Sequence, residues 1–251
     1  DIRRIEEKAG TVTPSLMERA GAAAADLAAQ LVSDRGKDVL VLAGPGNNGG
    51  DARIAAAILK EKFFRVAIAD AANPPPDRNW GLVVDGLFGI GLARAIDGEY
   101  AKLVDYANAQ PCPLLALDIP SGIESDTGRV LGHAVRATHT ITFIALKPGL
   151  LTLDGPDHCG AVTVADLGLE PKDLVAPSGW VAGPGLFQDV LKPRPRNFHK
   201  GQAGSVCILG GASGMVGAAL LAGRAALMLG AGRVYVGMLA QDAPAVDPVA
   251  P

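Results

Sequence analysis

Apolar and polar residues alternate in blocks along the first two thirds of the chain, and these blocks predict strands separated by helices. Short apolar runs bounded by glycine, proline or polar residues are typical of buried strands. The predicted strands are 38–43, 64–69, 80–84, 113–117 and 138–144. Apolar residues at helical spacing predict helices at 13–32, 51–60 and 99–109. Strands alternating with helices predict an α/β fold with a Rossmann-like, doubly wound and mostly parallel sheet.

The first predicted helix carries start signals ahead of its apolar stripe. Thr13 is expected to cap this helix, and Pro14 is expected at the first helical position, where its missing N–H is not needed. Residues 71–79 contain three consecutive prolines and are predicted to form a loop.

The pattern changes around residues 171–195, where prolines and glycines crowd the chain. A new strand, loop, helix and strand follow, in the segments "SVCILGG", "ASGMVG", "AALLAGRAALMLGAG" and "RVYVGML". A parallel sheet needs more than two strands to bury both of its faces, so we expect the start of a second domain. The predicted organisation is a first domain over 1–175, a linker over 176–198 and a truncated domain over 199–251. Since the first residue is Asp1 and not Met, earlier residues are also expected to be absent.

Composition narrows the class of protein. The 251 residues are 49% hydrophobic and 20% charged, which is ordinary for a globular protein. A net charge of −3 offers no general attraction for nucleic acid or an anionic membrane, and no apolar run reaches the roughly 18 residues of a membrane span. The three cysteines show neither metal-binding spacing nor a disulfide framework, which favours a reducing, cytoplasmic location.

A glycine-rich turn, "GPGNNGGD", lies between the first predicted strand and the next helix. Gly44, Gly46 and Gly49 satisfy the G-x-G-x-x-G pattern of dinucleotide-binding folds. Asp70 follows about 20 residues later, where an acid would bind a ribose in such folds. A nicotinamide-dependent oxidoreductase is therefore the first hypothesis, although this pattern alone is weakly specific.

Oxygen-bearing side chains interrupt the same turn. Asn47 and Asn48 precede Asp51, whose carboxylate at the predicted helix start would occupy the place of a bound phosphate. The alternative is structural: the two asparagines would tolerate left-handed turn angles, and Asp51 would cap the helix.

The other predicted strands also end in polar or glycine-rich residues. Ligands bind beyond the carboxyl ends of strands in an open parallel sheet, so residues at these ends are expected to converge. Asn48, Asp85 and Ser121 would then form a set of hard oxygen ligands. One carboxylate with neutral oxygens suits a monovalent cation better than magnesium or zinc.

Four segments in this order, "GPGNNGGD", "VDGLFGIGL", "LDIPSG" and "HTITFIALKPGLLT", resemble the motifs of the NAD(P)H-hydrate epimerase domain, the YjeF N-terminal domain. The later segment "HKGQAGSVCILGGASGMVGAALLAGRAALMLGAG" resembles the opening of the ADP-dependent NAD(P)H-hydrate dehydratase domain, which has a ribokinase-like fold. Together the four motifs and the later segment resemble the bifunctional repair enzymes of bacteria.

The resemblance implies an activity, cofactors and a site. The substrates would be hydrated NADH and NADPH (NADHX and NADPHX), whose R and S forms the first domain interconverts. The second domain, when complete, would dehydrate the S form using ADP and magnesium. The implied potassium ligands are Asn48, Asp85 and Ser121. The implied substrate-binding residues are Asn47, Asn48, Gly49, Gly50, Asp51, Gly89, Ile90, Gly91, Leu92, Ala93, Arg94, Ala95, Asp118 and, in the second domain, Ala218.

Asp118 is the candidate catalytic acid–base residue, because the hydrated carbon must lose and regain a hydroxyl group. Cleavage of its C–O bond and ring opening would both invert this carbon, and the sequence favours neither route. Lys147 could pair with substrate phosphates or tune Asp118, and a solvated surface lysine is an equal alternative.

Two other classes stay open alongside the epimerase. An oxidoreductase predicts simple phosphate contacts at residues 44–50 without a cation. A non-catalytic module that binds dinucleotides or acts in RNA turnover, as some eukaryotic relatives do, predicts loss of the polar strand ends, which are all present. We expect a homo-oligomer, with no nucleic-acid or membrane partner. The choice between NADH and NADPH hydrates is undetermined.

Overall fold

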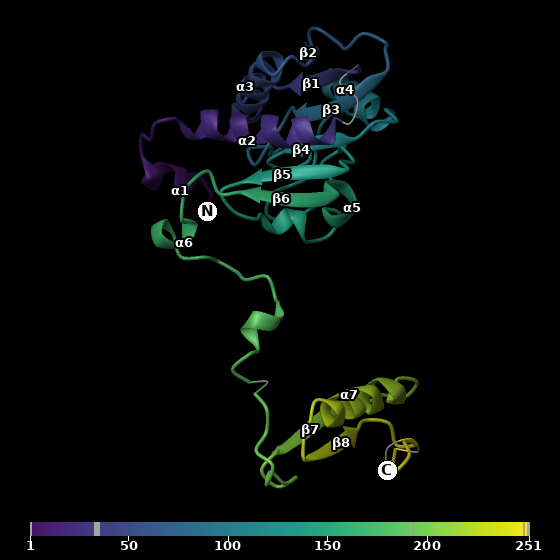
Figure 1. Ribbon diagram of the computed structural model, residues 1–251. Helices are drawn as coiled ribbons and strands as arrows, with labels where there is room; N and C mark the ends of the chain where they lie inside the picture. The colour runs from purple at the N-terminus through teal and green to yellow at the C-terminus, as the bar shows by residue number, and fades with distance from the viewer. Residues whose placement is uncertain (1, 33–35, 191, 248, 250–251) are drawn as a thin grey trace. The chain divides into compact units, whose positions relative to one another are not determined.

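The computed structural model describes residues 2–32, 36–190, 192–247 and 249 (Figure 1). Two compact units divide the chain, Asp1–Gly179 and Trp180–Pro251. A six-stranded sheet forms the centre of the first unit, and a two-stranded sheet lies in the second. None of the helices in the described part of the chain is both long and apolar enough to span a bilayer.

The first unit is an α/β sheet in which all strand pairs are parallel. Its strand order is β2-β1-β3-β4-β5-β6. The chain reverses direction across the sheet between β1 and β3, which makes a topological switch point at their carboxyl ends. The strands are β1 (Asp38–Ala43), β2 (Val66–Ala69), β3 (Trp80–Gly86), β4 (Leu114–Leu117), β5 (His139–Phe143) and β6 (Ala161–Ala165). The predicted doubly wound parallel sheet is confirmed.

Helices cover both faces of this sheet (Figure 1). Successive β1 residues point to opposite faces, so Val39 packs in the core under α2 and α3, while Leu40 packs in the core under α4. Burial on both faces explains why β1 is a continuous apolar run. The helices are α1 (Ile2–Ala9), α2 (Leu16–Leu31), α3 (Asn47–Glu61), α4 (Gly98–Asn108), α5 (Pro156–Cys159) and α6 (Pro171–Leu174), with the 3-10 turn η1 (Pro148–Leu150).

The predicted start of α2 is wrong. Ser15, not Thr13, is the N-cap: its hydroxyl accepts a hydrogen bond from the Glu18 N–H at 3.3 Å. The Glu18 carboxylate accepts the Ser15 N–H in return, at 2.7 Å. This reciprocal capping box has the pattern S-x-x-E, and it places Pro14 before the helix.

The predicted start of α3 is also wrong, by four residues. The helix begins at Asn47, so Asp51 lies in its second turn and neither caps the helix nor takes a phosphate's place. Neither Asn47 nor Asn48 has a positive φ, which excludes the turn-angle explanation for them. Gly49 is required by packing, because a Cβ there would lie 1.9 Å from the carbonyl oxygen of Gly44.

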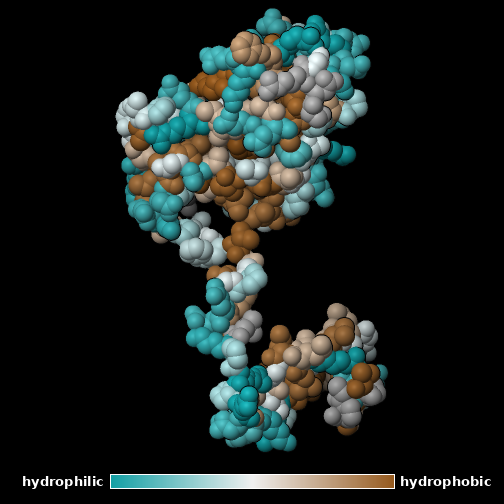
Figure 2. Space-filling view, in the orientation of Figure 1, coloured by the Kyte–Doolittle hydropathy of each residue, from teal (hydrophilic) through white to brown (hydrophobic). Residues whose placement is uncertain are grey.

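The second unit holds β7 (Ser205–Gly210) and β8 (Arg233–Met238), which pair in parallel, with α7 (Val216–Met228) packed on them. The 3-10 turn η2 (Pro184–Leu186) precedes them. Large apolar side chains such as Leu209 and Met228 are exposed, and Figure 2 shows hydrophobic surface on this unit. The predicted strand, helix and strand are present.

Replacing the N-cap of α2 tests the corrected helix start. Ser15→Ala removes the hydroxyl that accepts the Glu18 N–H, so we expect a loss of about 1 kcal/mol in the free energy of unfolding. Thr13→Ala is the matched control and should cause no comparable loss. Urea unfolding followed by circular dichroism measures both, and a larger loss for Thr13→Ala would contradict this helix start.

Candidate active site at the carboxyl edge of the sheet

Polar residues from four strand ends meet at the carboxyl edge of the first sheet. Asn48 lies in the first turn of α3, just after β1. Asp85 is the second-last residue of β3, and Asp118 directly follows β4. Lys147 lies in the segment between β5 and η1. These positions surround the topological switch point, where open α/β sheets bind ligands.

A buried ion pair joins Asp118 to Lys147. The Lys147 Nζ lies 2.6 Å from Asp118 Oδ1, and the two side chains are 3% and 13% exposed. The ammonium group also donates to Thr142 Oγ1 and to the Phe143 carbonyl oxygen, each at 2.7 Å. Burial lowers the pKa of Lys147, and the nearby Asp118 carboxylate opposes that effect. The surface-lysine alternative is therefore wrong, because all three ammonium hydrogens have buried partners.

The backbone holds Asp118 in an unusual conformation. Its φ is +69°, in the left-handed region that non-glycine residues rarely adopt. The Asp118 N–H donates to the Ile141 carbonyl oxygen at 2.7 Å, while Oδ2 accepts the Ile90 N–H at 3.3 Å. Strain of this kind persists only where surrounding contacts impose it, and it is common at functional sites.

A second buried carboxylate, Asp85, is held by Ser121. The Ser121 hydroxyl donates to Asp85 Oδ1 at 2.7 Å, and its backbone N–H donates to Oδ2 at 2.8 Å. Asp85 is completely buried, and burial raises its pKa to about 6 against the opposing effect of the Ser121 and Leu87 hydrogen bonds. A nearby positive charge would therefore stabilise the ionised form of Asp85.

The Asn48 side chain is buried, and neither atom of its amide has a hydrogen-bond partner in the described structure. A Cβ at Gly86 would lie 3.1 Å from the Asn48 carbonyl oxygen, so Asn48 packs beside the residue after Asp85. A Cβ at Gly89 would lie 3.0 Å from Asp118 Oδ2 and 3.4 Å from the Asn48 Cβ. Because a buried amide without a partner is costly, this one indicates a place for a ligand.

The side-chain oxygens of Asn48, Asp85 and Ser121 suit the monovalent cation predicted from the sequence. They comprise one carboxylate, one amide oxygen and one hydroxyl, all hard oxygen ligands. Over the described ranges, no group of three His, Cys, Asp or Glu side chains is placed to hold a metal ion. Asp85 and Ser121 are in direct contact, and Asn48 lies next to them at the same edge.

A further acidic pair adjoins Asp118. Asp51 is nearly buried, and burial, followed by the charges of Asp118 and Glu6, raises its pKa to about 7. Burial also raises the pKa of Glu6, with a smaller contribution from Asp118. Sequence reasoning missed Glu6 because it missed α1, although the apolar pair Ile2 and Ile5 has helical spacing.

The predicted substrate-binding residues lie in three places. Gly89 and Ile90 contact Asp118, and Gly91 lies beside Arg3 of α1. Ala95 lies farther along the same loop, beside Gly132. Asn47 is exposed at the start of α3. Ala218 lies in the first turn of α7, in the second unit.

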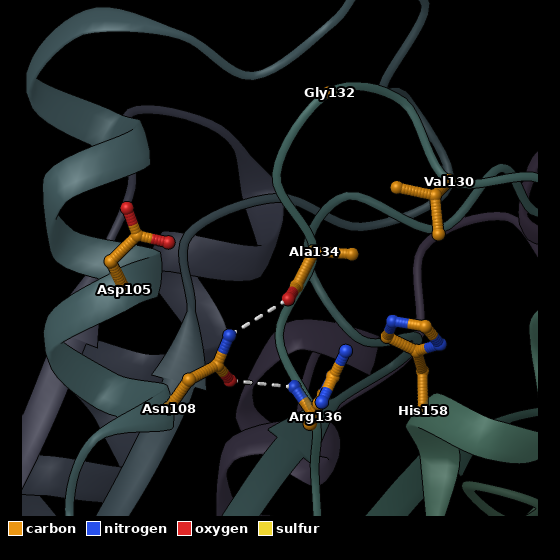
Figure 3. A pocket seen from close by; sticks show the side chains of 7 residues that line it. All are labelled: Asp105, Asn108, Val130, Gly132, Ala134, Arg136 and His158. Carbon is orange, nitrogen blue, oxygen red and sulfur yellow. Dashed lines mark hydrogen bonds between the residues drawn. The ribbon is translucent and has the colours of Figure 1, made fainter.

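A separate cleft of about 450 Å³ lies between the end of α4 and the segment leading into β5 (Figure 3). None of its residues was predicted to be functional. The Asn108 amide forms its wall by donating to the Ala134 carbonyl oxygen and accepting the Arg136 N–H. The cleft is lined by Asp105, Asn108, Val130, Gly132, Ala134, Arg136 and His158.

Comparison with known proteins identifies the family to which the first unit is similar. The family described as YjeF-related protein N-terminus matches residues 13–80 and 69–149. The NAD(P)H-hydrate epimerase of Bordetella pertussis (strain CS) is 42% identical, over 71% of this chain and 90% of that protein. The bifunctional NAD(P)H-hydrate repair enzyme Nnr of Escherichia coli (strain K12) is 37% identical, over 94% of this chain. The bifunctional NAD(P)H-hydrate repair enzyme of Leishmania braziliensis is 34% identical, over 88% of this chain.

The chain belongs to the family of YjeF-related N-terminal domains. It spans about half the length of the two bifunctional relatives, 52% of the Escherichia coli protein and 46% of the Leishmania protein. It covers nearly the whole length of the epimerase from Bordetella.

The raised pKa of Asp51 predicts a stability change with pH. Folding favours the protonated form of Asp51. The resulting contribution to the free energy of unfolding is complete below the ordinary pKa of 3.8 and is lost as the pH rises through about 7. Asp51→Asn stays neutral, so at pH 8 it should be more stable than the parent protein by about 2–4 kcal/mol.

Urea unfolding at pH 4 and pH 8 measures this difference. Most of the gain should disappear at pH 4, where Asp51 is protonated in the folded protein and is therefore as neutral as asparagine. Asp126→Asn, which changes an exposed carboxylate of the same unit, is the control and should show no gain at either pH. An equal gain for Asp51→Asn at both pH values would show that charge burial is not its cause.

Proposed function

We propose that the first unit epimerises the R and S forms of hydrated NADH and NADPH. One observation carries this proposal: Gly89 lies between the buried Asp118–Lys147 pair and the unpartnered amide of Asn48, close to both side chains. An acid–base group and a buried amide without a hydrogen-bond partner thus lie together at the carboxyl edge of the sheet, where open α/β sheets bind ligands. The names of the epimerase and repair-enzyme relatives supply the identity of the substrate.

Asp118 would act on the hydrated carbon, which bears a hydroxyl group and neighbours the ring nitrogen. In its protonated form, Asp118 donates a proton to that hydroxyl, the C–O bond breaks, and water leaves. The nitrogen shares the positive charge of the ring, and the Asp118 carboxylate stabilises it. Water then adds to the other face and returns a proton to Asp118. Ring opening and reclosure would invert the same carbon.

Lys147 would position the reacting carboxylate. Its ammonium group binds Asp118 Oδ1, which leaves Oδ2, on the side of Gly89 and Ile90, as the oxygen that transfers the proton. The substrate-binding segments in this proposal are residues 47–51 and 89–95. A tightly held carboxylate favours catalysis because little reorganisation is needed during the reaction.

A potassium ion is the proposed cofactor, held by Asn48, Asp85 and Ser121. The fit rests on the orphaned Asn48 amide and on the buried carboxylate of Asp85. When bound, the ion would supply a fixed positive charge beside the substrate. ADP and magnesium would belong to the dehydratase domain that we propose begins at 199, in which Ala218 would contact the hydrate.

The two other classes of protein, an oxidoreductase and a non-catalytic binding module, explain fewer of the polar residues at the carboxyl edge of the sheet. An oxidoreductase would use the start of α3 for phosphate, and it leaves the buried Asn48 amide and the Asp118–Lys147 pair unexplained. A non-catalytic module gives no reason for two buried carboxylates. Homo-oligomerisation, a cytoplasmic location and the lack of nucleic-acid partners stay predictions.

Replacing Asp118 tests the proposed mechanism. Asp118→Asn keeps the shape of the side chain, and asparagine tolerates the left-handed backbone at this position. Because the acid–base group is lost, we expect epimerisation to fall at least about 100-fold. Epimerisation of purified R hydrate, with the S form trapped by a separate dehydratase, measures this loss.

The double variant Asp118→Asn, Lys147→Met controls for unfolding, since it removes the lysine charge that the single variant leaves unpaired. Thermal melting should show a folded protein for the double variant, and it should be equally inactive. Asp126→Asn should keep full activity. Near-normal turnover by folded Asp118→Asn would exclude Asp118 as the acid–base residue.

A further inference from the structure

The guanidinium group of Arg53 is fixed over the glycine turn, although Arg53 is exposed in the second turn of α3. Its Nη1 donates to the Gly44 carbonyl oxygen at 2.8 Å, and its Nη2 lies 3.4 Å from the Ala43 carbonyl oxygen. A Cβ at Gly49 would lie 2.9 Å from Nη1. Two backbone carbonyls at the end of β1 therefore hold this positive charge in place.

Arg53 keeps hydrogen-bond donors for a ligand. A guanidinium has five N–H groups, and the two carbonyl contacts occupy only two of them. Arg65 and Arg78 both form ion pairs with Asp38. Within the described ranges no carboxylate lies at ion-pair distance from Arg53, and the acidic group on which its charge acts is Asp70. A fixed guanidinium with free N–H groups is well suited to bind a phosphate through two parallel hydrogen bonds.

The neighbouring strand end places this group at the ribose position of a dinucleotide fold. Asp70 directly follows β2, and Leu42 of β1 pairs with Ala69 of β2. In such folds, an acid at the end of the second strand binds a ribose 2′-hydroxyl, or a nearby arginine accepts a 2′-phosphate. Asp70 Oδ1 already accepts the N–H groups of Ala72 and Asn73 and the Asn73 side-chain amide, so this oxygen is used within its own turn. The Asn73 hydrogen bond lowers the pKa of Asp70 most, and the Arg53 charge lowers it further, which places the two side chains near each other.

Asp118 and this position lie three strand spacings apart along the carboxyl edge of the sheet. Asp118 follows β4 and Asp70 follows β2, with β3 and β1 between them in the sheet. Neighbouring strands are about 4.8 Å apart, so three steps cover about 14 Å. A nicotinamide ring at Asp118 and an adenosine ribose beside Arg53 can belong to one extended molecule.

We propose that Arg53 binds the 2′-phosphate on the adenosine ribose of the substrate and makes the site selective for the hydrate of NADPH over that of NADH. This inference rests on the proposed function for the identity of its ligand. Arg53 is then a specificity-determining residue, and the chemistry at Asp118 does not depend on it.

Arg53→Gln tests this proposal through the ratio of kcat/KM for NADPH hydrate to kcat/KM for NADH hydrate. Loss of a charge-assisted phosphate contact should lower that ratio at least about tenfold, mainly through the KM for NADPH hydrate. Lys60→Gln removes the same charge from the last turn of α3 and should leave the ratio unchanged. If Arg53 had a purely structural role, its replacement would change kcat/KM for both hydrates by the same factor.

An unchanged ratio in Arg53→Gln, or an equal fall for both hydrates, would overturn the proposal. If Arg53→Gln does not fold, Arg53→Lys keeps the charge but not the planar fork. The ratio for Arg53→Lys should then fall at least about threefold, since one phosphate contact is lost. A parental ratio for this variant would count equally against the proposal.

Binding of adenosine fragments separates this proposal from the epimerase assignment, because it needs no turnover. Titration calorimetry should show that the parental protein binds 2′,5′-ADP at least about tenfold more tightly than 5′-AMP, and that Arg53→Gln removes the difference. Equal affinities in the parental protein would overturn the 2′-phosphate site even if epimerisation is found. An Arg53-dependent difference without epimerisation would instead contradict the proposed function and leave this site standing.

Discussion

The buried ion pair between Asp118 and Lys147 is the contact on which the carboxyl edge of the sheet depends. Removing two charges from water is costly, and the cost is repaid only where the geometry is good and every remaining donor is satisfied. Both conditions hold, because the three ammonium hydrogens reach Asp118, Thr142 and the Phe143 carbonyl oxygen. Breaking one side of such a pair costs about 3–5 kcal/mol. The pair therefore fixes the β4 and β5 ends and the orientation of the Asp118 carboxylate.

The remaining polar groups at this edge lower the stability of the folded chain. Asp85 and Asp51 are buried carboxylates with raised pKa values, and the Asn48 amide has no partner in the described structure. A chain selected for stability alone would replace such groups with apolar ones. A bound cation and a polar substrate would relieve these costs, which ties the unfavourable features to function.

The sequence predicted the topology well and the element boundaries less well. Apolar runs revealed β1, β3, β4 and β5 because burial on both faces makes them continuous. The edge strand β2 was found because it is apolar although only partly buried, whereas the edge strand β6 is mostly exposed and was missed. The parallel topology gathers strand ends, so Asn48, Asp85, Asp118 and Ser121 could be grouped in advance. Burial of Lys147 and the fixed position of Arg53 depend on tertiary contacts, which no local pattern records. The glycine-rich turn also led to a wrong prediction of the helix start, because Gly49 and Gly50 lie within α3.

The rate of epimerisation in potassium and in sodium tests the central claim most directly. Purified R hydrate would be supplied with an excess of an S-specific dehydratase, and the recovery of nicotinamide absorbance would be followed with and without this protein. A cation site beside Asp118 predicts acceleration that is strong in potassium and weak in sodium. No acceleration in either salt, from protein shown to be folded, would contradict the epimerase account and favour a site that only binds a dinucleotide.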